Sequence, residues 1–493
     1  RLVVYKAMSA ASSKLFITYP LSDLSGQAKY PARIVDSIIK MFGREDIRKT
    51  EDDIPVHFYT VTLHSAFYHY MQHRDENTPS LSAVEKLLLS RNEYRRRLTY
   101  VLNRSSHTQN YIIDTATMEK LRSFDPLRLS STGMEEYDQC HFKFFCDKCL
   151  DLHPCEKVEL DARIAGELTH ECFYGILGSR SKKDFIAMSY DDVKKEIGTR
   201  AADYRRRAMA GDFGKDAKFE LIFNKLTDRM TEVFLHTQQS LMASDFEPHK
   251  FELDLRKSHS VVMRFGNKGK KLSFGGIVDR ADICNIGGTD YVRIVDYKSS
   301  RKELNAKILG SGINMQMLLY LFASTDKGGF YENFKPAGVL YTPIQVSDLS
   351  LEEYKVDSIN TSALDSSLKT SGLVLSDMDV LNAMEKNVAG RYIPVRLKKD
   401  GTPDSKSGCI SAAGMEKLKE LTYRKLREMA ESLYSGNVEA VPLMIGNTLP
   451  CSYCDYINIC DNSKPDRWRY PDEEAVAEAQ AILDMKTDGK ESE

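Results

Sequence analysis

Two aspartates and a lysine carry the first chemical signal, because each aspartate follows an apolar run. In FGGIVDRADICNIGGTDYVRIVDYKSS, Asp279 follows Ile-Val, Asp296 follows the next Ile-Val, and Lys298 comes two residues later. Residues two apart in a strand point to the same face, so Asp296 and Lys298 should lie together. Oxygen ligands hold Mg²⁺ or Mn²⁺, and a bound ion acidifies water for hydrolysis. An isolated Asp-x-Lys is nevertheless common by chance and usually marks a solvated strand end or a salt bridge.

Polar residues on two helix-like segments strengthen this signal. His170 lies in IAGELTHECFYGIL, on the polar face of the expected helix. Gln316 and Tyr320 are one turn apart in the apolar segment INMQMLLYLFA, where an unpaired amide would be costly. These groups need partners, and the acidic edge of a sheet could provide them. A single histidine is more often structural than functional, so only the combination is informative.

A cysteine cluster near the end of the sequence forms a second signal. The segment PCSYCDYINICD places Cys451, Cys454 and Cys460 in the spacing C-x2-C-x5-C. Three thiolates need a fourth ligand to complete a tetrahedral zinc site or a cubane iron–sulfur cluster. One alternative is a four-cysteine zinc site that combines Cys146 and Cys149 with Cys451 and Cys454.

The elements that must position these residues alternate between strands and helices. The runs RLVVY, at the start, and LFIT, at 15–18, are typical of core strands. Strands are also expected at 251–255, 271–279, 291–298 and 338–342, and helices at 31–42, 82–102, 216–242, 306–323 and 411–434. This alternation predicts an α/β fold.

Composition limits the possible functions. Of 493 residues, 69 are Lys or Arg and 71 are Asp or Glu, so the net charge of -2 excludes a uniformly basic nucleic-acid binder. A local basic groove remains possible, with 205–207, 268, 270 and 271 as candidates. The sequence has neither a secretory signal nor an apolar run long enough for a membrane helix, so we expect a cytoplasmic protein. It begins at Arg1 inside a strand-like run, as a fragment of a longer protein would.

The ordered motifs G-x3-H at 166–170, G-I-V-D-R at 276–280, D-Y-K at 296–298 and Q-x3-Y at 316–320 resemble the RecB family of PD-(D/E)XK nucleases. The resemblance implies a mixed central sheet flanked by helices and a metal-dependent deoxyribonuclease. Arg280 is expected to contact phosphate or to pair with Asp282, and Glu252 has a weaker claim as a carboxylate behind the ligands. The implied metal ligands are His170, Asp279, Asp296 and the carbonyl of Tyr297; Lys298 assists the water, and Gln316 and Tyr320 help to position DNA and the site.

A further resemblance concerns the missing fourth thiolate. The segment SSTGMEEYDQCHFKFF is similar to the upstream cysteine segment of iron–sulfur nucleases related to RecB, except that His141 replaces their proline. The resemblance implies a [4Fe-4S] cluster that fastens the C-terminal segment to the start of the nuclease domain. Its implied ligands are Cys140, Cys451, Cys454 and Cys460.

Beyond these motifs, the segments 14–31, 390–407 and 433–443 resemble the AddB component of bacterial AddAB helicase–nucleases. This resemblance implies three parts: 1–120, the end of an inactivated superfamily 1 helicase-like α/β domain; 121–465, the nuclease domain with a helical insertion at about 185–245; and 466–493, a polar tail. No ATPase activity is expected, because Ala10 stands where such helicases have an arginine and no G-x4-G-K-[ST] loop occurs.

The resemblance also implies a biological role. The chain would belong to a bacterial cytoplasmic heterodimer with an AddA-like helicase–nuclease subunit, and it would process double-strand DNA ends for recombinational repair. It would cut the 5′-terminated single strand. The alternative is a catalytically silent scaffold that guides DNA and is braced by the cluster. The full set His170, Asp279, Asp296 and Lys298 argues against that alternative, because a silent domain needs none of the four. A standalone CRISPR-associated nuclease is disfavoured by the helicase-like first 120 residues.

Overall fold

The computed structural model divides the chain into two compact units, residues 1–109 and 110–493. It describes residues 2–13, 15, 17–19, 29–42, 56–74, 76, 78–105, 112–122, 127–153, 162–208, 217–258, 261–265, 269–298, 302–343, 368–460 and 468–486. The expected domain boundary between residues 120 and 121 lies within helix α7 (Thr115–Leu121) of the second unit.

The described part of the first unit is helical. Its helices are α1 (Leu2–Ser9), α2 (Arg33–Phe42), α3 (Val56–Tyr59), α4 (Leu63–His73), α5 (Pro79–Leu89) and α6 (Asn92–Ser105). The side chains of Thr62 and Thr78 accept backbone hydrogen bonds and so cap the N-termini of α4 and α5. Ala66, Leu88 and Leu98 are fully buried where α4, α5 and α6 pack together.

A six-stranded mixed sheet forms the centre of the second unit. Its strand order is β2-β5-β6-β7-β8-β9, with the pair β6 and β7 and the pair β8 and β9 parallel and the other pairs antiparallel. The strands are β2 (Glu247–Asp254), β5 (Ile277–Ile286), β6 (Thr289–Lys298), β7 (Lys335–Pro343), β8 (Ser371–Leu375) and β9 (Cys409–Ile410). A second sheet has the order β1-β4-β3, from β1 (Leu127–Leu129), β3 (Val261–Phe265) and β4 (Lys270–Phe274).

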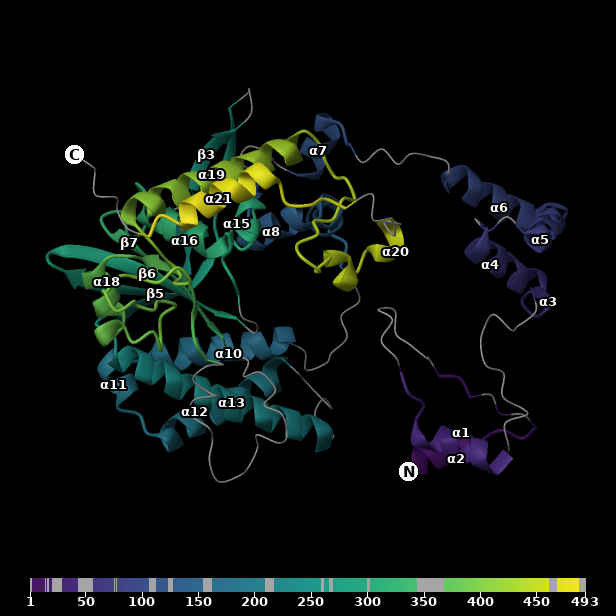
Figure 1. Ribbon diagram of the computed structural model, residues 1–493, viewed down its shortest axis with the longest axis horizontal. Coiled ribbons are helices and arrows are strands. Elements are labelled where there is room, and N and C mark those ends of the chain that lie inside the picture. The colour runs from purple at the N-terminus through teal and green to yellow at the C-terminus, as the bar shows by residue number, and fades with distance from the viewer. Residues whose placement is uncertain are drawn as a thin grey trace. The chain divides into compact units, whose positions relative to one another are not determined.

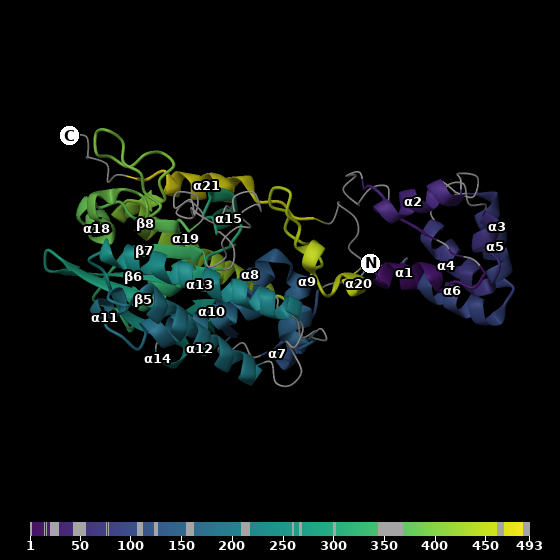
Figure 2. The ribbon, with the colours of Figure 1, turned by 90° about the horizontal axis from the view of Figure 1, so that it is seen from below.

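Helices cover both faces of the central sheet. On one side lie α10 (Ala162–Leu177), α11 (Lys182–Ile186), α12 (Tyr190–Ala208) and α13 (Ala217–Met242), whereas α16 (Gln316–Thr325), α19 (Ala412–Tyr434) and α21 (Glu473–Leu483) lie on the other (Figure 1). Figure 2 views the molecule from the side of α10 to α13, which there lie in front of the sheet. The remaining elements are α8 (Ser131–Gln139), α9 (His141–Phe144), η2 (Phe145–Cys149), α14 (Leu255–Ser258), α15 (Ala306–Gly310), α18 (Met378–Met384), η3 (Lys386–Val388), η4 (Pro450–Tyr453) and α20 (Ile457–Cys460).

Strand β6 connects the two layers because its side chains alternate between faces. Val292 and Ile294 are buried in the core that α16 and α19 share, whereas Tyr297 is buried among residues of α10 and α13. The end of β6 is therefore a place where side chains from both helical layers can meet. The expected fold class, a mixed sheet flanked by helices, is confirmed.

Several expected elements are correct and others are wrong. The strand expected at 271–279 is two strands, because the chain breaks at Gly275 and Gly276; a Cβ at Gly276 would overlap the Tyr320 hydroxyl. The helix expected at 306–323 is interrupted between α15 and α16, where Gly312 has φ +80° and packs against Asp138. Residues 82–102 form two helices, because the Ser90 side chain caps α5 by donating to the Leu87 carbonyl.

The two strands expected near the start are also wrong. Residues 2–5 belong to α1, and the described residues 15, 17 and 18 lie outside any helix or strand. By contrast, the strands expected at 291–298 and 338–342 and the helices at 216–242 and 411–434 are confirmed by β6, β7, α13 and α19. In the part of the chain that the structure describes, no helix is long and apolar enough to cross a membrane.

Candidate active site

The two aspartates of the sequence signal meet at one end of a β-hairpin. Asp279 lies near the start of β5 and Asp296 near the end of β6, and these strands pair antiparallel with Arg280 opposite Val295. The backbone N–H of Tyr297 donates a 3.0 Å hydrogen bond to Asp279 Oδ2. Asp296 is only 2% exposed. The antiparallel hairpin therefore brings the two carboxylates close enough for Asp279 to influence the pKa of Asp296, but Asp296 is not among the residues whose ligand atoms lie within 4.8 Å of one another, which are His170, Glu252 and Asp279. The sequence pattern instead suggests that both aspartates stand at the ends of successive strands.

Lys298 lies beside Asp296, as strand alternation predicts. Its Nζ is 2.9 Å from Asp296 Oδ2 and donates a 3.1 Å hydrogen bond to Oδ1. Burial and, to a smaller extent, the neighbouring charge of Asp279 raise the pKa of Asp296 to about 7, although Lys298 and His170 act in the opposite direction. Burial acts to lower the pKa of Lys298, but Asp296 and Asp279 outweigh it and the pKa is raised. Lys298 is thus held as a cation at the site.

His170 reaches the same point from helix α10. Its Nδ1 is 3.3 Å from Asp279 Oδ2, and its Nε2 is 3.0 Å from the carbonyl oxygen of Tyr297. Burial acts to lower the pKa of His170, but the contact with Asp279 and the charge of Asp296 raise it overall. The imidazole therefore lies between an aspartate and a backbone oxygen that were both expected to be metal ligands.

Glu252 is closer to this group than its weak sequence signal indicated. It lies on β2 between residues that pair with Arg280 and Val278, so it faces Asp279 across the strands. One ligand atom from each of His170, Glu252 and Asp279 lies within 4.8 Å of the others. Glu252 has φ +48°, an unusual conformation for a non-glycine residue in a strand. Sequence alone gives no signal for that conformation.

These donors fit a small divalent cation. The set combines carboxylate oxygens, a backbone carbonyl and an imidazole nitrogen, which suits Mg²⁺ or Mn²⁺. Adjacent ligands of an octahedral ion with bonds of about 2.1 Å lie about 3.0 Å apart, which is the spacing of His170 Nε2 and the Tyr297 carbonyl. In addition, the buried Oδ2 of Asp296 has no partner in hydrogen-bonding geometry, although Lys298 Nζ is only 2.9 Å away. A cation would give that oxygen a partner.

Gln316 and Tyr320 form a polar pair at the start of α16. Gln316 Nε2 donates to the Tyr320 hydroxyl at 3.1 Å, and that hydroxyl is 2.9 Å from Ser131 Oγ of α8. The partner of the Gln316 amide is thus its own helix neighbour, not the acidic edge as expected. Because the Tyr320 hydroxyl occupies the space beside Gly276, the Q-x3-Y and G-I-V-D segments pack directly on each other.

Sequence reasoning missed Glu135 on α8. Burial raises the pKa of its carboxyl group, whereas the nearby charges of Lys302 and Lys298 lower it. Glu135 is four residues after Ser131, so one face of α8 carries both residues toward the site. The available signal was the acidic residue inside SSTGMEEYDQC, a segment quoted only for its cysteine.

The two expectations for Arg280 are resolved by its burial. Its side chain is 6% exposed, and its Nε lies 2.8 Å from Asp282 Oδ1. The salt bridge is therefore correct, and direct contact with phosphate is wrong. Four of the basic residues proposed for a DNA groove are engaged in ion pairs: Arg205, Arg206 and Arg207 pair with Glu220, Asp203 and Glu171, and Lys270 pairs with Glu119, whereas Lys271 is exposed. Residue 268 lies outside the described residues.

The cysteines expected to bind a cluster lie in one region. Burial, together with the nearby thiols of Cys140, Cys454 and Cys460, raises the pKa of Cys451 to about 11. In the described ranges, however, no cysteines form a group with ligand atoms within 4.8 Å of one another. The sulfurs therefore do not converge as closely as a single zinc ion requires, since Zn–S bonds of about 2.3 Å place sulfurs about 3.8 Å apart.

Two further cysteines bear on the zinc alternative. Cys146 has its pKa raised to about 11 by burial and by Cys454, Cys140 and Cys460. The pKa of Cys149 is raised by burial, and the charge that opposes this comes from Arg122. Cys146 thus lies with the other thiols, whereas Cys149 lies against Arg122, which disfavours a zinc site that uses both.

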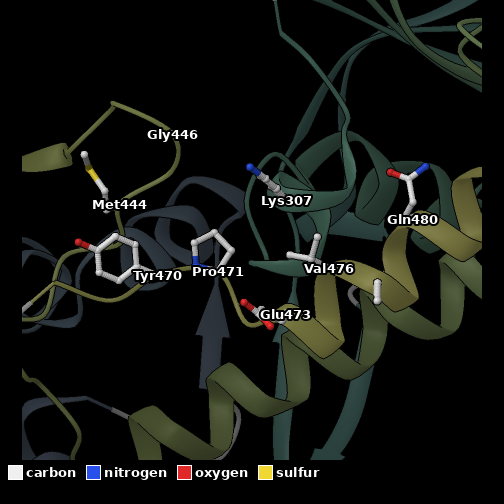
Figure 3. Close-up of a pocket in the computed structure, with 9 residues that line it drawn as sticks. Lys307, Met444, Gly446, Tyr470, Pro471, Glu473, Val476 and Gln480 are labelled. Carbon is white, nitrogen blue, oxygen red and sulfur yellow. The ribbon is translucent and has the colours of Figure 1, made fainter.

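A pocket elsewhere in the second unit has a volume of about 590 Å³ and lies between α15, α21 and the segments near residues 444 and 470 (Figure 3). None of the predicted site residues lines it, and we assign it no part in the chemistry. Its lining residues are Lys307, Met444, Gly446, Tyr470, Pro471, Glu473, Val476, Ala477 and Gln480.

Comparison with known proteins gives consistent results. Residues 128–461 match a model of the PD-(D/E)XK nuclease superfamily. The chain is 23% identical over 479 residues to the B-type subunit of the ATP-dependent helicase/deoxyribonuclease of Clostridium tetani (strain Massachusetts / E88), and 26% identical over 489 residues to its counterpart from Exiguobacterium sibiricum. These alignments cover 93% of this chain but 41% and 42% of the relatives, so the chain spans about two fifths of their length.

Proposed function

The chain belongs to the PD-(D/E)XK nuclease superfamily, and from this premise we propose that it hydrolyses phosphodiester bonds of single-stranded DNA with Mg²⁺ or Mn²⁺. The main support for this proposal is that Asp279, His170 and the Tyr297 carbonyl lie together at the end of β6, with Lys298 beside Asp296. When bound, the ion would supply an acidified water and charge stabilisation for the phosphate.

The residues of this chain would divide the remaining work. His170, Asp279, Asp296 and the Tyr297 carbonyl would hold the ion, and Glu252 would contribute a further carboxylate. Lys298, kept protonated by Asp296, would orient the attacking water and stabilise the charge that develops on the phosphate. Gln316 and Tyr320, which bridge α16 and α8, would position DNA and fix the wall of the site.

The relatives extend this proposal to a larger assembly. We propose that the chain is part of the AddB component of a bacterial helicase–nuclease that works with an AddA-like partner on DNA ends. Its support is similarity to such helicase/deoxyribonuclease subunits over 93% of the chain. Such a protein would cut the 5′-terminated strand in the bacterial cytoplasm, while the partner supplies the ATPase motor.

A nuclease assay on the purified chain tests the first proposal. We expect single-stranded DNA to be degraded in the presence of Mn²⁺ or Mg²⁺ and to stay intact in EDTA. EDTA removes the divalent ion, which would acidify the attacking water. ATP should make no difference to the isolated chain. Intact DNA at every Mn²⁺ concentration would contradict the proposal and favour the scaffold alternative.

We also propose a [4Fe-4S] cluster on Cys140, Cys451, Cys454 and Cys460. Its support is the spacing of the cysteines and the mutual influence of their thiols on pKa. A cubane holds its ligands farther apart than one zinc ion does, because four irons lie between them. The cluster would tie the C-terminal segment to the start of the nuclease domain.

Anaerobically purified protein should therefore be brown and contain about four irons per chain, with broad absorbance near roughly 400 nm. Cys454→Ser should lose the iron and unfold at lower temperature, because the C-terminal segment is then released. Cys149→Ser is the matched control and should keep the colour, since that thiol lies against Arg122. A colourless protein with one zinc that is lost in Cys149→Ser would instead support the zinc alternative.

A further inference from the structure

The side chain of Tyr297 has no part in the proposed chemistry, yet it joins the groups that do. It is 2% exposed, and its ring stacks on Phe173 of α10 with ring centroids 3.9 Å apart. Phe173 follows His170 by three residues on that helix. The Tyr297 backbone meanwhile contacts Asp279 through its N–H and His170 through its carbonyl. One residue thus connects the sheet, the helix and two expected ligands.

The Tyr297 hydroxyl accepts a hydrogen bond of 2.7 Å from Arg280 Nη1. Behind it lies a buried group of charges, since Arg280, Asp282 and Arg293 are 5%, 0% and 2% exposed. Asp282 pairs with both guanidiniums, at 2.8 Å from Arg280 Nε and 3.0 Å from Arg293 Nε. Because the two buried guanidiniums of Arg280 and Arg293 share one carboxylate, each additional hydrogen-bond acceptor for their N–H groups stabilises the buried charges. The Tyr297 hydroxyl is such an acceptor for Arg280, in addition to the carboxylate of Asp282.

This arrangement fixes the position of Tyr297 from two directions. The stack on Phe173 holds the ring against α10, and the buried charges hold the hydroxyl against β5. Displacing the ring would leave Arg280 Nη1 buried without this acceptor, which is unfavourable. The end of β6 is thereby fixed relative to α10, and so is the spacing between the Tyr297 carbonyl and His170.

We propose that the Tyr297 hydroxyl and Arg280 are positioning residues for the metal site: they set the end of β6 against α10 so that the Tyr297 carbonyl and His170 face the same ion. The inference rests on the proposed metal-dependent function. Small divalent ions accept little variation in ligand distance, so a small shift between strand and helix would weaken binding. Neither side chain touches the ion or the DNA.

Tyr297→Phe tests this inference because it removes the hydroxyl and keeps the ring stack. The matched control is Tyr423→Phe. Tyr423 lies on α19, away from the proposed ligands, and its hydroxyl also forms a 2.7 Å hydrogen bond with a charged group, the carboxylate of Asp326. We would measure Mn²⁺ binding by calorimetry and thermal unfolding without metal. Tyr297→Phe should weaken Mn²⁺ binding about tenfold or more, whereas Tyr423→Phe should leave it within about twofold, since groups behind metal ligands typically contribute 10–100-fold in affinity.

Arg280→Lys provides a second variant, because it keeps the positive charge and loses the donor to the phenol; it should reproduce the weaker Mn²⁺ binding. The inference would be overturned if Tyr297→Phe bound Mn²⁺ as tightly as the unmodified chain. It would also be overturned if Tyr423→Phe lost as much Mn²⁺ affinity as Tyr297→Phe, because that result would indicate general destabilisation. If the unmodified chain bound no Mn²⁺, the proposed function itself would fail. The two failures are therefore distinguishable.

Discussion

Asp296→Ala is expected to reduce the rate of DNA cleavage by at least about a thousandfold. Loss of one electrostatic stabiliser in an active site already costs about 10²–10³ in rate, and this change removes a carboxylate that would hold the ion itself. Binding of Mn²⁺ should weaken in parallel. The measurement is the single-turnover cleavage rate at saturating Mn²⁺, together with calorimetric titration of the ion.

In the absence of metal, the unfolding temperature of the same variant should be within about 3 °C of that of the unmodified chain, or higher than it. The reason differs from the one suggested by sequence, which placed this carboxylate at the edge of a sheet and outside the core. Asp296 is buried, and burial together with Asp279 raises its pKa to about 7, so its charged form is unfavourable before an ion binds. Asp290→Ala, at the exposed start of the same strand, is the control and should cleave normally. Substantial Mg²⁺-dependent cleavage by Asp296→Ala would show that the site has been placed wrongly.

Lys298→Ala is expected to lower the cleavage rate by about 10²–10⁴, the range for loss of a group that assists proton transfer. Unlike Asp296→Ala, it should keep or strengthen Mn²⁺ binding, because it removes a cation that lies 2.9 Å from Asp296. Parallel measurement of rate and Mn²⁺ affinity therefore separates the two roles.

Lys335→Ala serves as the control for Lys298→Ala. Lys335 starts the neighbouring strand β7 and pairs with Tyr291, at the opposite end of β6 from Lys298. It is exposed and should have no effect on cleavage. If Lys298→Ala lost Mn²⁺ affinity as strongly as Asp296→Ala, Lys298 would have a structural role in the ligand set, and its assignment to the water would be wrong.

Sequence reasoning worked best where local pattern and chemistry coincided. The alternation of β6 placed Asp296 and Lys298 on one face, and the one-turn spacing of Gln316 and Tyr320 placed those two side chains in contact. The roles of these residues as a metal-dependent site stay predictions. The periodicity of apolar residues also predicted the bounds of the long helices α13 and α19 to within one residue, because each helix has a continuous apolar face.

The remaining features depend on tertiary contacts that pattern does not record. The break between β4 and β5 exists because Tyr320, from a distant helix, fills the space beside Gly276. Glu252 joins the site through a positive φ inside a strand, where alternation alone would not single it out. Glu135 reaches the site because α8 packs against α16. The opening segment RLVVY has strand propensity, but its residues 2–5 are helical, an example of how weak local propensity is over so few residues.

The hairpin of β5 and β6 has a consequence for the order in which the site assembles during folding. The hydrogen bond from Tyr297 to Asp279 spans 18 residues, whereas the contact of His170 with Tyr297 spans 127. Closing a short loop costs less chain entropy, and local hairpins form faster than long-range contacts. The two carboxylates should accordingly come together early, as an acidic hairpin, and the imidazole should arrive only when α10 docks. Divalent cations would then encounter three of the four residues proposed to hold them, Asp279, Asp296 and Tyr297, on a partly folded chain, and their binding would favour the later docking step.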